Sequence, residues 1–500
     1  MYRGKEVKMN FSEALRKESQ ITKTENGAIA LNTTGDACLD LFSTIGSLRN
    51  TDENRIYTLF EEAYKENPLY ATKIVFYGRD IREGLGERDT FRILLRYIAN
   101  KHPEAIQGNI ALIGEYGRYD DLYFLCDTSL ENDMWKFICR TFNEDIEKMN
   151  NNESISLLAK WLKSVNTSSK ESNRLGKLTA KKLGLSIKDY RKTLSQLRSY
   201  LRVTEKYLTR NAWEDIDYSR VPSNAMLNYR NAFSRHDLDR FTEYLESVKK
   251  GNAKINANTL YPYDLVEKVL FNGEQSDVIE AQWDALPDYV EKGTNALVMA
   301  DVSGSMYGRP LATSIGLALY FAERNEGAYH NLFMTFSSNP KIISIKGDTI
   351  TQKIRNINKA TWGINTDLEA AFDKVLSIAI KNNIPSEEMV KSIIVVSDME
   401  IDYCTSKDWT FYDYMKKKYN EKGYDIPNIV FWNVNSRNDV FHSDKDKKGV
   451  QLCSGQSVTV FKQLMKSIGM TPVEMMDEVI NSERYNPITL NDGFDENLFV

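Results

Sequence analysis

The sequence predicts a protein of class α + α/β, in which an all-α N-terminal part precedes an α/β part with a doubly wound, mostly parallel sheet. In the first part, apolar residues recur at helical spacing over roughly 200 residues. In the second part, short runs of consecutive apolar residues alternate with helical segments, as expected for strands buried on both faces of a parallel sheet. A chain of 500 residues is also longer than one ordinary core supports, which favours at least two domains.

Changes in pattern divide the chain into three predicted segments. Residues 1–50 are polar and weakly patterned, so we expect an extended lead-in with one short helix near residues 11–16. Residues 51–292 form the helical domain with its connector. Residues 293–500 form the α/β domain, which closes in an acid-rich tail from Asp492 onward.

The helical domain shows a clear packing face. Phe91, Leu94, Leu95 and Ile98 fall at positions i, i+3, i+4 and i+7, the stripe of a helix packed on one side. Successive helices without strands predict an α-solenoid similar to HEAT repeats. The glycine-rich stretch at residues 78–88 has the composition of a phosphate-binding loop. It follows a helix and not a strand, however, so a tight turn between helices fits it better.

A basic segment lies within the helical domain. Residues 155–213 carry fourteen Lys or Arg against three Asp or Glu, a balance of +11 in a chain of net charge -5. Apolar residues between positions 186 and 208 alternate at spacings of three and four, which predicts one helix. Six cations fall within an arc of about 120° on a neighbouring face of that helix, namely Lys188, Arg191, Lys192, Arg198, Arg202 and Lys206.

Two interpretations of this basic stripe are open. It is either a solvated face or a contact for a polyanion, and its strength in an otherwise acidic chain favours the polyanion. Trp161, Tyr190 and Tyr200 either offer stacking to unpaired bases or belong to the core. The stripe is therefore our candidate RNA-binding surface.

The α/β domain is expected to contain at least five strands with helices between them. The strands are predicted near residues 296–300, 331–336, 341–345, 392–397 and 428–434, with a further one at 450–453. The helices are predicted near residues 311–322, 368–380 and 457–468.

Oxygen-bearing side chains follow two of the predicted strands. Asp301, Ser303 and Ser305 stand at i, i+2 and i+4 directly after the first strand, with Gly304 allowing the loop to fold back. Thr366 precedes a predicted helix, and Asp398 ends the fourth strand. Because ligands of parallel sheets collect beyond the carboxyl ends of the strands, we expect these five side chains to converge there. Hard oxygen ligands suit Mg²⁺, Mn²⁺ or Ca²⁺ better than zinc.

This ordered set resembles the metal-ion-dependent adhesion site (MIDAS) of von Willebrand factor A (vWA) domains, which have a Rossmann-like fold. The resemblance implies that Ser303 and Ser305 bind the metal directly. It also implies that Thr366, Asp301 and Asp398 act directly or through water. A vWA scaffold whose site holds no ion is the alternative.

A second resemblance covers residues 55–485. The matching segments are residues 78–88, 115–122, 160–162, 189–192, 221–223 and 361–367. They are similar to the DUF2828 family, whose members join a helical N-terminal part to a C-terminal vWA domain. The architecture is in turn similar to the TROVE-module Ro proteins, in which a HEAT-like ring closed by a vWA domain binds small structured RNAs and misfolded RNA ends. That likeness implies RNA binding by analogy of architecture.

Composition excludes several classes of protein. Hydrophobic and charged contents of 42% and 27% are those of a soluble globular protein. We find neither an apolar run of eighteen residues nor the apolar core of a signal peptide, so we expect a cytoplasmic protein without a membrane span. The five cysteines are odd in number and scattered, which favours free thiols in a reducing compartment.

The sequence favours binding over catalysis. No common hydrolase, metalloprotease or P-loop motif is present, and the four histidines stand far apart. The first hypothesis is a non-catalytic, metal-dependent scaffold of ribonucleoprotein type that binds small structured or single-stranded RNA. The alternative is a protein-interaction module whose metal captures an acidic residue of a partner.

Overall fold

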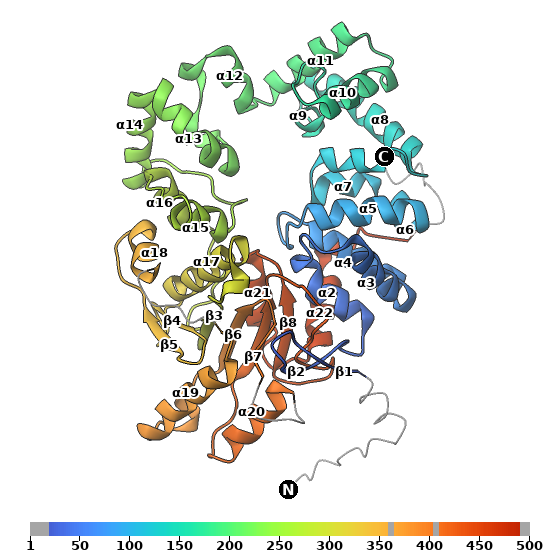
Figure 1. Cartoon of the computed structure of the whole chain (residues 1–500). Helices are drawn as coiled ribbons and strands as arrows, with labels where there is room; N and C mark the ends of the chain where they lie inside the picture. Colours follow the sequence, from blue (N-terminus) through green and yellow to red (C-terminus); the bar gives the residue numbers. More distant parts are fainter. Residues whose placement is uncertain (1–19, 359–364, 404–409, 491–500) are drawn as a thin grey trace. The chain divides into compact units, whose positions relative to one another are not determined.

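The computed structural model describes residues 20–358, 365–403 and 410–490 (Figure 1). The chain forms two compact units, each treated by itself. The α/β unit comprises the described residues within 1–51, 289–347 and 353–479. The helical unit comprises those within 52–288, 348–352 and 480–500. The expected helix near residues 11–16, the loop residues 361–364 and the tail from Asp492 lie outside the described residues.

The α/β unit is built on a six-stranded sheet with the strand order β5-β4-β3-β6-β7-β8. In chain order the strands are β3 (Ala296–Ala300), β4 (Leu332–Thr335), β5 (Lys341–Ser344), β6 (Ser392–Ser397), β7 (Asn428–Asn433) and β8 (Val450–Ser454). Every neighbouring pair is parallel except β4 and β5, which are antiparallel. The prediction of a mostly parallel sheet and the positions of its strands are confirmed.

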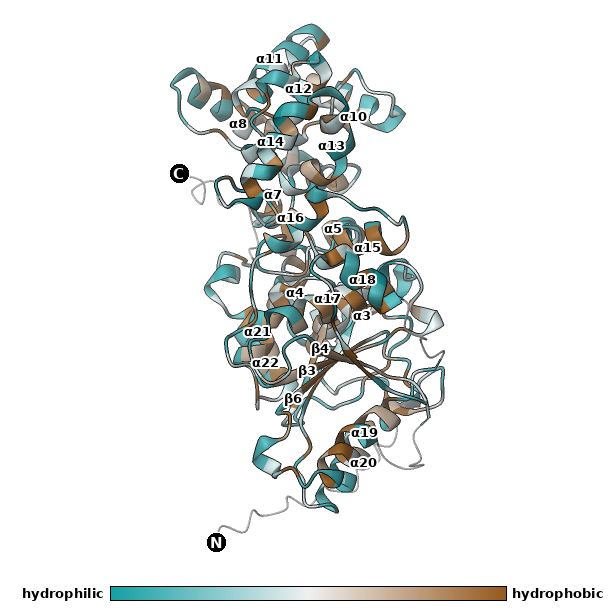
Figure 2. Ribbon diagram, turned by 90° about the vertical axis from the view of Figure 1, so that its left-hand side faces the viewer, coloured by the Kyte–Doolittle hydropathy of each residue, from teal (hydrophilic) through white to brown (hydrophobic). Residues whose placement is uncertain are grey.

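Helices cover both faces of this sheet. Figures 1 and 2 show α17 (Arg309–Arg324) and α21 (Thr459–Lys466) on one face, with α19 (Leu368–Lys381) and α20 (Phe411–Asn420) on the other. Successive side chains of a strand point to opposite faces. Accordingly, Trp432 of β7 packs on Phe461 of α21 with ring centroids 4.8 Å apart. Its neighbour Phe431 meets Phe411 of α20 at 6.4 Å. A strand buried on both sides reads as an unbroken apolar run, which is why these strands were predictable.

The N-terminal segment contributes elements that the sequence pattern did not reveal. Strands β1 (Ile21–Lys23) and β2 (Ile29–Leu31) form an antiparallel hairpin, and α2 (Ala37–Thr44) follows. Leu31 and Phe441 exchange both backbone hydrogen bonds at 2.8 Å. Strands of three residues are too short to show an alternating pattern, and the segment therefore looks like a polar lead-in when the sequence alone is considered.

The helical unit contains helices and turns, and no strand among its described residues. Its α-helices are α3 (Glu53–Glu66), α4 (Pro68–Arg79), α5 (Asp89–Lys101), α6 (Glu104–Gln107), α7 (Ile110–Tyr116), α8 (Glu131–Asn150), α9 (Leu158–Trp161), α10 (Lys170–Lys182), α11 (Ile187–Tyr200), α12 (Thr204–Arg210), α13 (Ser223–His236), α14 (Leu238–Lys249), α15 (Pro262–Leu270) and α16 (Asp277–Asp284). The predicted packing face of α5 is fully buried. Residues 80–88 form the turn between α4 and α5, and residues 78–79 are the last of α4, so the predicted turn between helices is present. Within the described ranges, no helix of either unit combines the length and apolar character that a membrane span requires.

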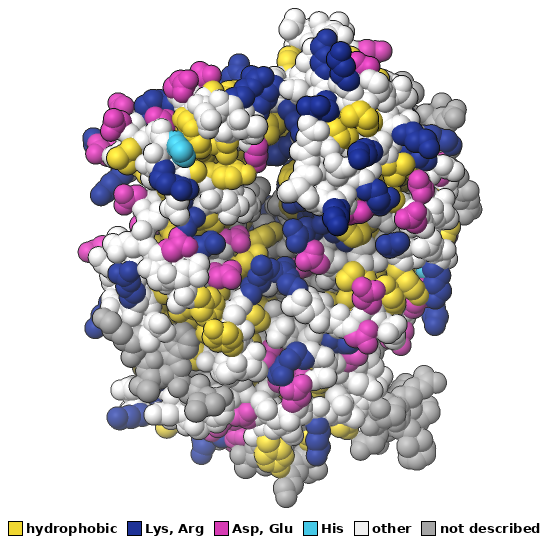
Figure 3. All heavy atoms as spheres, turned by 45° about the horizontal axis from the view of Figure 1, so that its top comes forward, with side chains coloured by type: hydrophobic (Ala, Val, Ile, Leu, Met, Phe, Trp, Pro, Cys, Tyr) yellow, Lys and Arg dark blue, Asp and Glu magenta, His cyan; other side chains and the backbone are white. Residues whose placement is uncertain are grey.

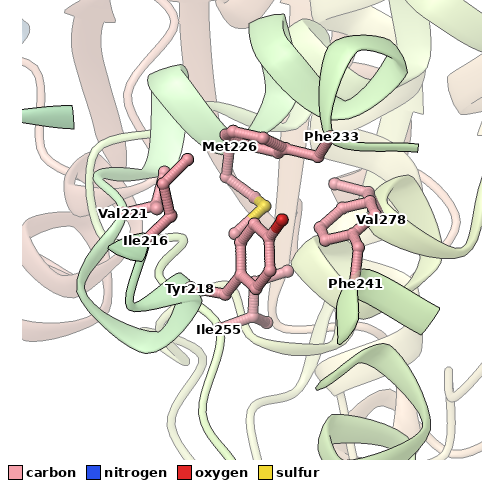
Figure 4. Close-up of a cluster of buried hydrophobic side chains, with 8 residues drawn as sticks. All are labelled: Ile216, Tyr218, Val221, Met226, Phe233, Phe241, Ile255 and Val278. Atoms are coloured by element: carbon pink, nitrogen blue, oxygen red, sulfur yellow. The ribbon is translucent and has the colours of Figure 1, made fainter. Parts of the chain in front are cut away.

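Two cores stabilise the helical unit. One lies among α13, α14, α16 and their connections, where Tyr218 packs against Phe233 and Phe241 with ring centroids 5.2 and 4.9 Å apart (Figure 4). The Tyr218 hydroxyl donates to Asp237 Oδ2 at 2.8 Å, so its polar end is satisfied.

The other core surrounds a charged network. Asp121 is fully buried and accepts from Arg79 Nε at 2.8 Å and from Arg92 Nε at 2.6 Å. Burial by itself raises the pKa of the neighbouring Asp120. The hydrogen bond from Arg118, with the charges of Arg118, Arg92 and Lys163, outweighs burial and lowers that pKa to about 2. The arginines and Lys163 thus keep the Asp120 carboxylate ionised inside the protein.

We expect Asp121→Ala to destabilise the helical unit by about 3–5 kcal/mol, because it leaves the buried Arg79 guanidinium without its carboxylate partner. Urea unfolding followed by circular dichroism measures this loss. Glu246→Ala is the matched control, since Glu246 and its partner Lys250 are each about two-thirds exposed, and such a pair contributes at most about 1 kcal/mol. Equal losses for the two variants would contradict the buried role of Asp121.

Candidate metal centre and basic surface

The loop after β3 is folded around the carboxylate of Asp301. The backbone N–H of Asp301 donates to Val396 O at 2.9 Å, which extends the pairing of β3 with β6 by one residue. Its side chain is fully buried, and Oδ1 accepts from the Ser303 N–H at 2.9 Å. Oδ2 accepts from the Ser397 hydroxyl at 2.6 Å. The hydroxyls of Ser303 and Ser305 lie 3.1 Å apart, so the loop gathers three of the predicted ligands.

Asp398 reaches the same edge of the sheet from β6. It is 1% exposed, and its Oδ1 accepts from the Glu400 N–H at 3.1 Å. Its Oδ2 pairs with Arg437 Nη2 at 3.0 Å. Burial, and next the negative charge of Asp398, raises the pKa of Asp301 to about 6. The two carboxylates therefore influence each other at the carboxyl ends of adjacent parallel strands.

Thr366 is held by the loop that follows Asp398. Its N–H donates to Asp402 Oδ2 at 2.9 Å, and its hydroxyl lies 2.7 Å from Asp402 Oδ1. The same hydroxyl lies 3.0 Å from Glu400 O and accepts from Asn26 Nδ2 at 3.0 Å. The loop residues 361–364 before it lie outside the described residues.

Several acidic residues near these positions were not predicted. Glu400 is 1% exposed, accepts from Asn438 Nδ2 at 2.8 Å and accepts from the Glu25 N–H at 2.6 Å. Glu25 also pairs with Arg437 at 2.6 Å. The run Asp398, Glu400, Asp402 at i, i+2, i+4 after a strand was a usable signal in the sequence. Glu25 and Arg437 gave none, because they stand hundreds of positions apart.

The chemistry of these side chains suits a hard divalent cation. Hydroxyl and carboxylate oxygens are the ligands that Mg²⁺ and Mn²⁺ prefer. Arg437 balances the charge of Asp398, whereas Asp301 forms no ion pair with any residue that the structure describes. A buried, unpaired carboxylate is costly, and a bound cation would remove that cost.

The raised pKa of Asp301 gives a test that needs no metal. A carboxyl whose folded-state pKa rises from 3.8 to about 6 contributes stability below pH 3.8, and that contribution is lost as pH rises through about 6. We expect the melting temperature of the wild type, measured with chelator and compared with that of Asp301→Asn, to decrease as pH rises from 4 to 7. Differential scanning fluorimetry at several pH values measures this difference. Asp446→Asn, at an exposed loop position, is the control. Parallel pH profiles for wild type and Asp301→Asn would contradict the burial argument.

The basic stripe does not lie on one helix, and that prediction was wrong. Helix α11 ends at Tyr200 and α12 begins at Thr204. Between them Arg202 adopts a left-handed conformation with φ of 51°, which reverses the chain. No glycine or proline marks this break, so the apolar spacing appeared continuous in the sequence. Arg202 and Lys206 therefore do not share the helical face of Lys188, Arg191, Lys192 and Arg198.

Three of the six cations bond within the helical unit, and Arg191 is one of them, donating from Nε and Nη2 to the Asn166 amide oxygen at 3.1 and 2.7 Å. The Arg198 guanidinium donates to Ala159 O at 2.9 Å, Leu162 O at 2.7 Å and Ser164 Oγ at 2.9 Å, and so joins α11 to α9. Burial lowers the pKa of Arg198. Lys206 Nζ donates to Ser195 O at 2.7 Å and joins α12 to α11.

Arg191 is nevertheless exposed, as are the remaining three cations, Lys188, Lys192 and Arg202. Figure 3 shows many Lys and Arg side chains, in dark blue, over the upper right part of the surface, where Figure 1 has α10 and α11. Of the aromatic candidates, Tyr190 is fully buried and its hydroxyl donates to Lys163 O at 2.8 Å. Trp161 is half-buried and Tyr200 is exposed.

Comparison with known proteins bears on the family. A family model described as "Domain of unknown function (DUF2828)" matches residues 24–117 and 165–295. "Uncharacterized protein L728" of Acanthamoeba polyphaga mimivirus is 30% identical over 517 residues, covering 95% of this chain and 89% of that protein. The chain belongs to the DUF2828 family. The resemblance to DUF2828 is thereby confirmed. The α/β region matches a second family model, described as "Domain of unknown function (DUF7788)", over residues 295–491. All five candidate metal ligands lie within that second region.

Proposed function

We propose that the protein is a non-catalytic binding scaffold whose α/β unit is a vWA domain that holds a divalent cation, Mg²⁺ first and Mn²⁺ or Ca²⁺ next. The observation that carries the proposal is the convergence of Asp301, Ser303 and Ser305 with Asp398 where β3 and β6 end. Thr366 bonds to Glu400 O and Asp402 in the loop that follows Asp398, and we propose that it completes the site. We further propose that the helical unit is a HEAT-like solenoid comparable to that of Ro proteins.

The residues around this site favour binding over chemistry. Ser303, Ser305 and Thr366 are neutral ligands, and they would leave most of the charge of the ion available to an oxygen anion of a partner. A metal held in this way is a better electrophilic anchor than a generator of hydroxide. Arg437 pairs with both Asp398 and Glu25, whereas Asp301 has no cationic partner among the described residues, so a bound ion would supply one.

We propose single-stranded RNA as the partner of the helical unit, in a cytoplasmic ribonucleoprotein-type role. Lys188, Lys192 and Arg202 are exposed, and none of them pairs with a carboxylate anywhere in the described ranges. Uncompensated cations in an otherwise acidic chain favour contact with phosphates. The alternative partner is a protein that offers an acidic side chain to the metal.

Calorimetric titration tests the metal site. We expect the wild type to bind Mg²⁺ or Mn²⁺, Asp301→Ala to abolish binding and Asp446→Ala to leave it unchanged. Bound metal should stabilise the α/β unit by about 2.7 kcal/mol at 100 times the dissociation constant, because it binds only the folded state. A wild type that binds no divalent ion would remove the proposal. Chelation that unfolds the helical unit as well would instead indicate a structural ion.

The salt dependence of RNA binding tests the basic surface. The log–log slope of affinity against salt is about -0.7 per phosphate contacted on a single strand. The triple variant Lys188→Gln, Lys192→Gln, Arg202→Gln removes up to three contacts, so its slope should flatten by about 2. Glutamine keeps helix propensity, so helicity should not change.

Two controls accompany this experiment. Arg235→Gln, Lys249→Gln, Lys254→Gln changes three exposed cations elsewhere in the helical unit and should leave the slope unchanged. Asp301→Ala should also leave it unchanged, because its site belongs to the other unit. Wild-type affinity and slope in the Lys188 triple variant would overturn the RNA assignment and favour the protein partner.

A further inference from the structure

A cavity of about 640 Å³ lies in the helical unit, lined by residues of α9, α11 and α12 and by the loop after α9. Five cations line it, namely Lys160, Arg191, Arg198, Lys206 and Arg210. Glu205 is the one carboxylate residue in this lining. The cavity therefore carries a strong excess of positive charge.

Little in the protein neutralises this charge. Across the described ranges, none of the five cations forms an ion pair with an acidic side chain. Arg198 is held by Ala159 O, Leu162 O and Ser164 Oγ. Burial, and next the positive charge of Arg210 one helical turn later, lowers the pKa of Lys206. Like charges held together in a cavity favour an anionic ligand.

The wall of the cavity also offers an aromatic surface. Trp161 lines it and is half-buried. The Arg118 guanidinium lies 4.0 Å from the centroid of the Trp161 ring, and Lys160 Nζ lies 5.3 Å from it. These contacts hold the ring in position. Ser195 and Thr209 add neutral hydrogen-bonding groups to the lining. A ligand with both a phosphate and a flat ring matches this combination.

The size of the cavity limits the ligand. Pockets of about 300–1,000 Å³ hold one small-molecule ligand. A single nucleotide fits that range, whereas a duplex does not. Arginine and lysine bind phosphate through charge-assisted hydrogen bonds, and indole rings stack on bases.

We propose that this cavity binds one phosphorylated nucleotide, with the phosphate beside Arg191 and Arg210 and the base against Trp161. A free nucleoside monophosphate and the phosphorylated end of a single strand both have this chemistry. Binding of a strand end rests on the proposed RNA binding, whereas binding of a free nucleotide does not.

Calorimetry with AMP, adenosine and inorganic phosphate tests the site. We expect the wild type to bind AMP at least about tenfold more tightly than adenosine, because the phosphate contributes charge-assisted hydrogen bonds. Arg191→Gln, Arg210→Gln should weaken AMP binding by about tenfold or more. The matched control Lys188→Gln, Lys192→Gln changes two cations of the same helix α11 that do not line the cavity and should bind AMP as the wild type does. Trp161→Leu should weaken AMP but not inorganic phosphate.

A second comparison decides whether the ligand is the end of a strand or a free nucleotide. A 5′-phosphorylated oligonucleotide that binds more tightly than its 5′-hydroxyl twin, with the preference lost in Arg191→Gln, Arg210→Gln, supports the site and makes the strand end its ligand. AMP binding without that preference supports the site and makes a free nucleotide its ligand.

Two results would overturn the proposal. One is equal affinity of the wild-type protein for AMP and adenosine. This result does not depend on whether any variant folds. The other is equal weakening of AMP binding by the cavity variant and by the α11 control. Neither result bears on RNA binding by Lys188, Lys192 and Arg202, because that proposal is tested separately by the salt dependence of affinity for a longer strand.

Discussion

The parallel pairing of β3 with β6 is the constraint on which the candidate metal centre depends. It brings the ends of two strands, almost a hundred residues apart in the chain, to one edge of the sheet. Asp301 and Asp398 follow those ends, and burial leaves Asp301 to be balanced by hydrogen bonds alone. A sheet with a different strand order would separate the two carboxylates and dissolve the site. The negative charge at this edge of the sheet is thus a consequence of the strand order, which places Asp301 and Asp398 side by side.

Part of this could be predicted from the sequence, for identifiable reasons. Strands such as β6 are buried on both faces, so they read as unbroken apolar runs and their ends are visible. The side chains Asp301, Ser303 and Ser305 follow such an end directly, which made them predictable as a group. Glu25 and Arg437 were missed because only the folded chain brings them together. The hairpin of β1 and β2 was missed because three residues are too few for a periodic signal.

The basic segment shows a different limit of prediction. Apolar spacing predicted a helix correctly through Tyr200, but a left-handed residue at Arg202 ends it without glycine. Sequence also could not separate cations that bind the protein from cations that face solvent. Arg198 and Lys192 look alike in the pattern, yet Arg198 donates to three oxygens of the helical unit. Charge counting finds a basic region, and hydrogen-bond geometry decides which of its members are available to a ligand.

The hairpin of β1 and β2 has a consequence for how the chain folds during synthesis. Leu31 finds its backbone partner in Phe441, a residue made 410 positions later. At about 5–20 residues per second, the ribosome reaches that partner roughly 20–80 seconds after Leu31. Residues 52–288 of the helical unit lie between them in the sequence, whereas the segment of that unit from Ile480 onward is made after Phe441. The hairpin at the beginning of the chain can therefore form early, but it waits for the partner of Leu31 in a part of the α/β unit that is made late.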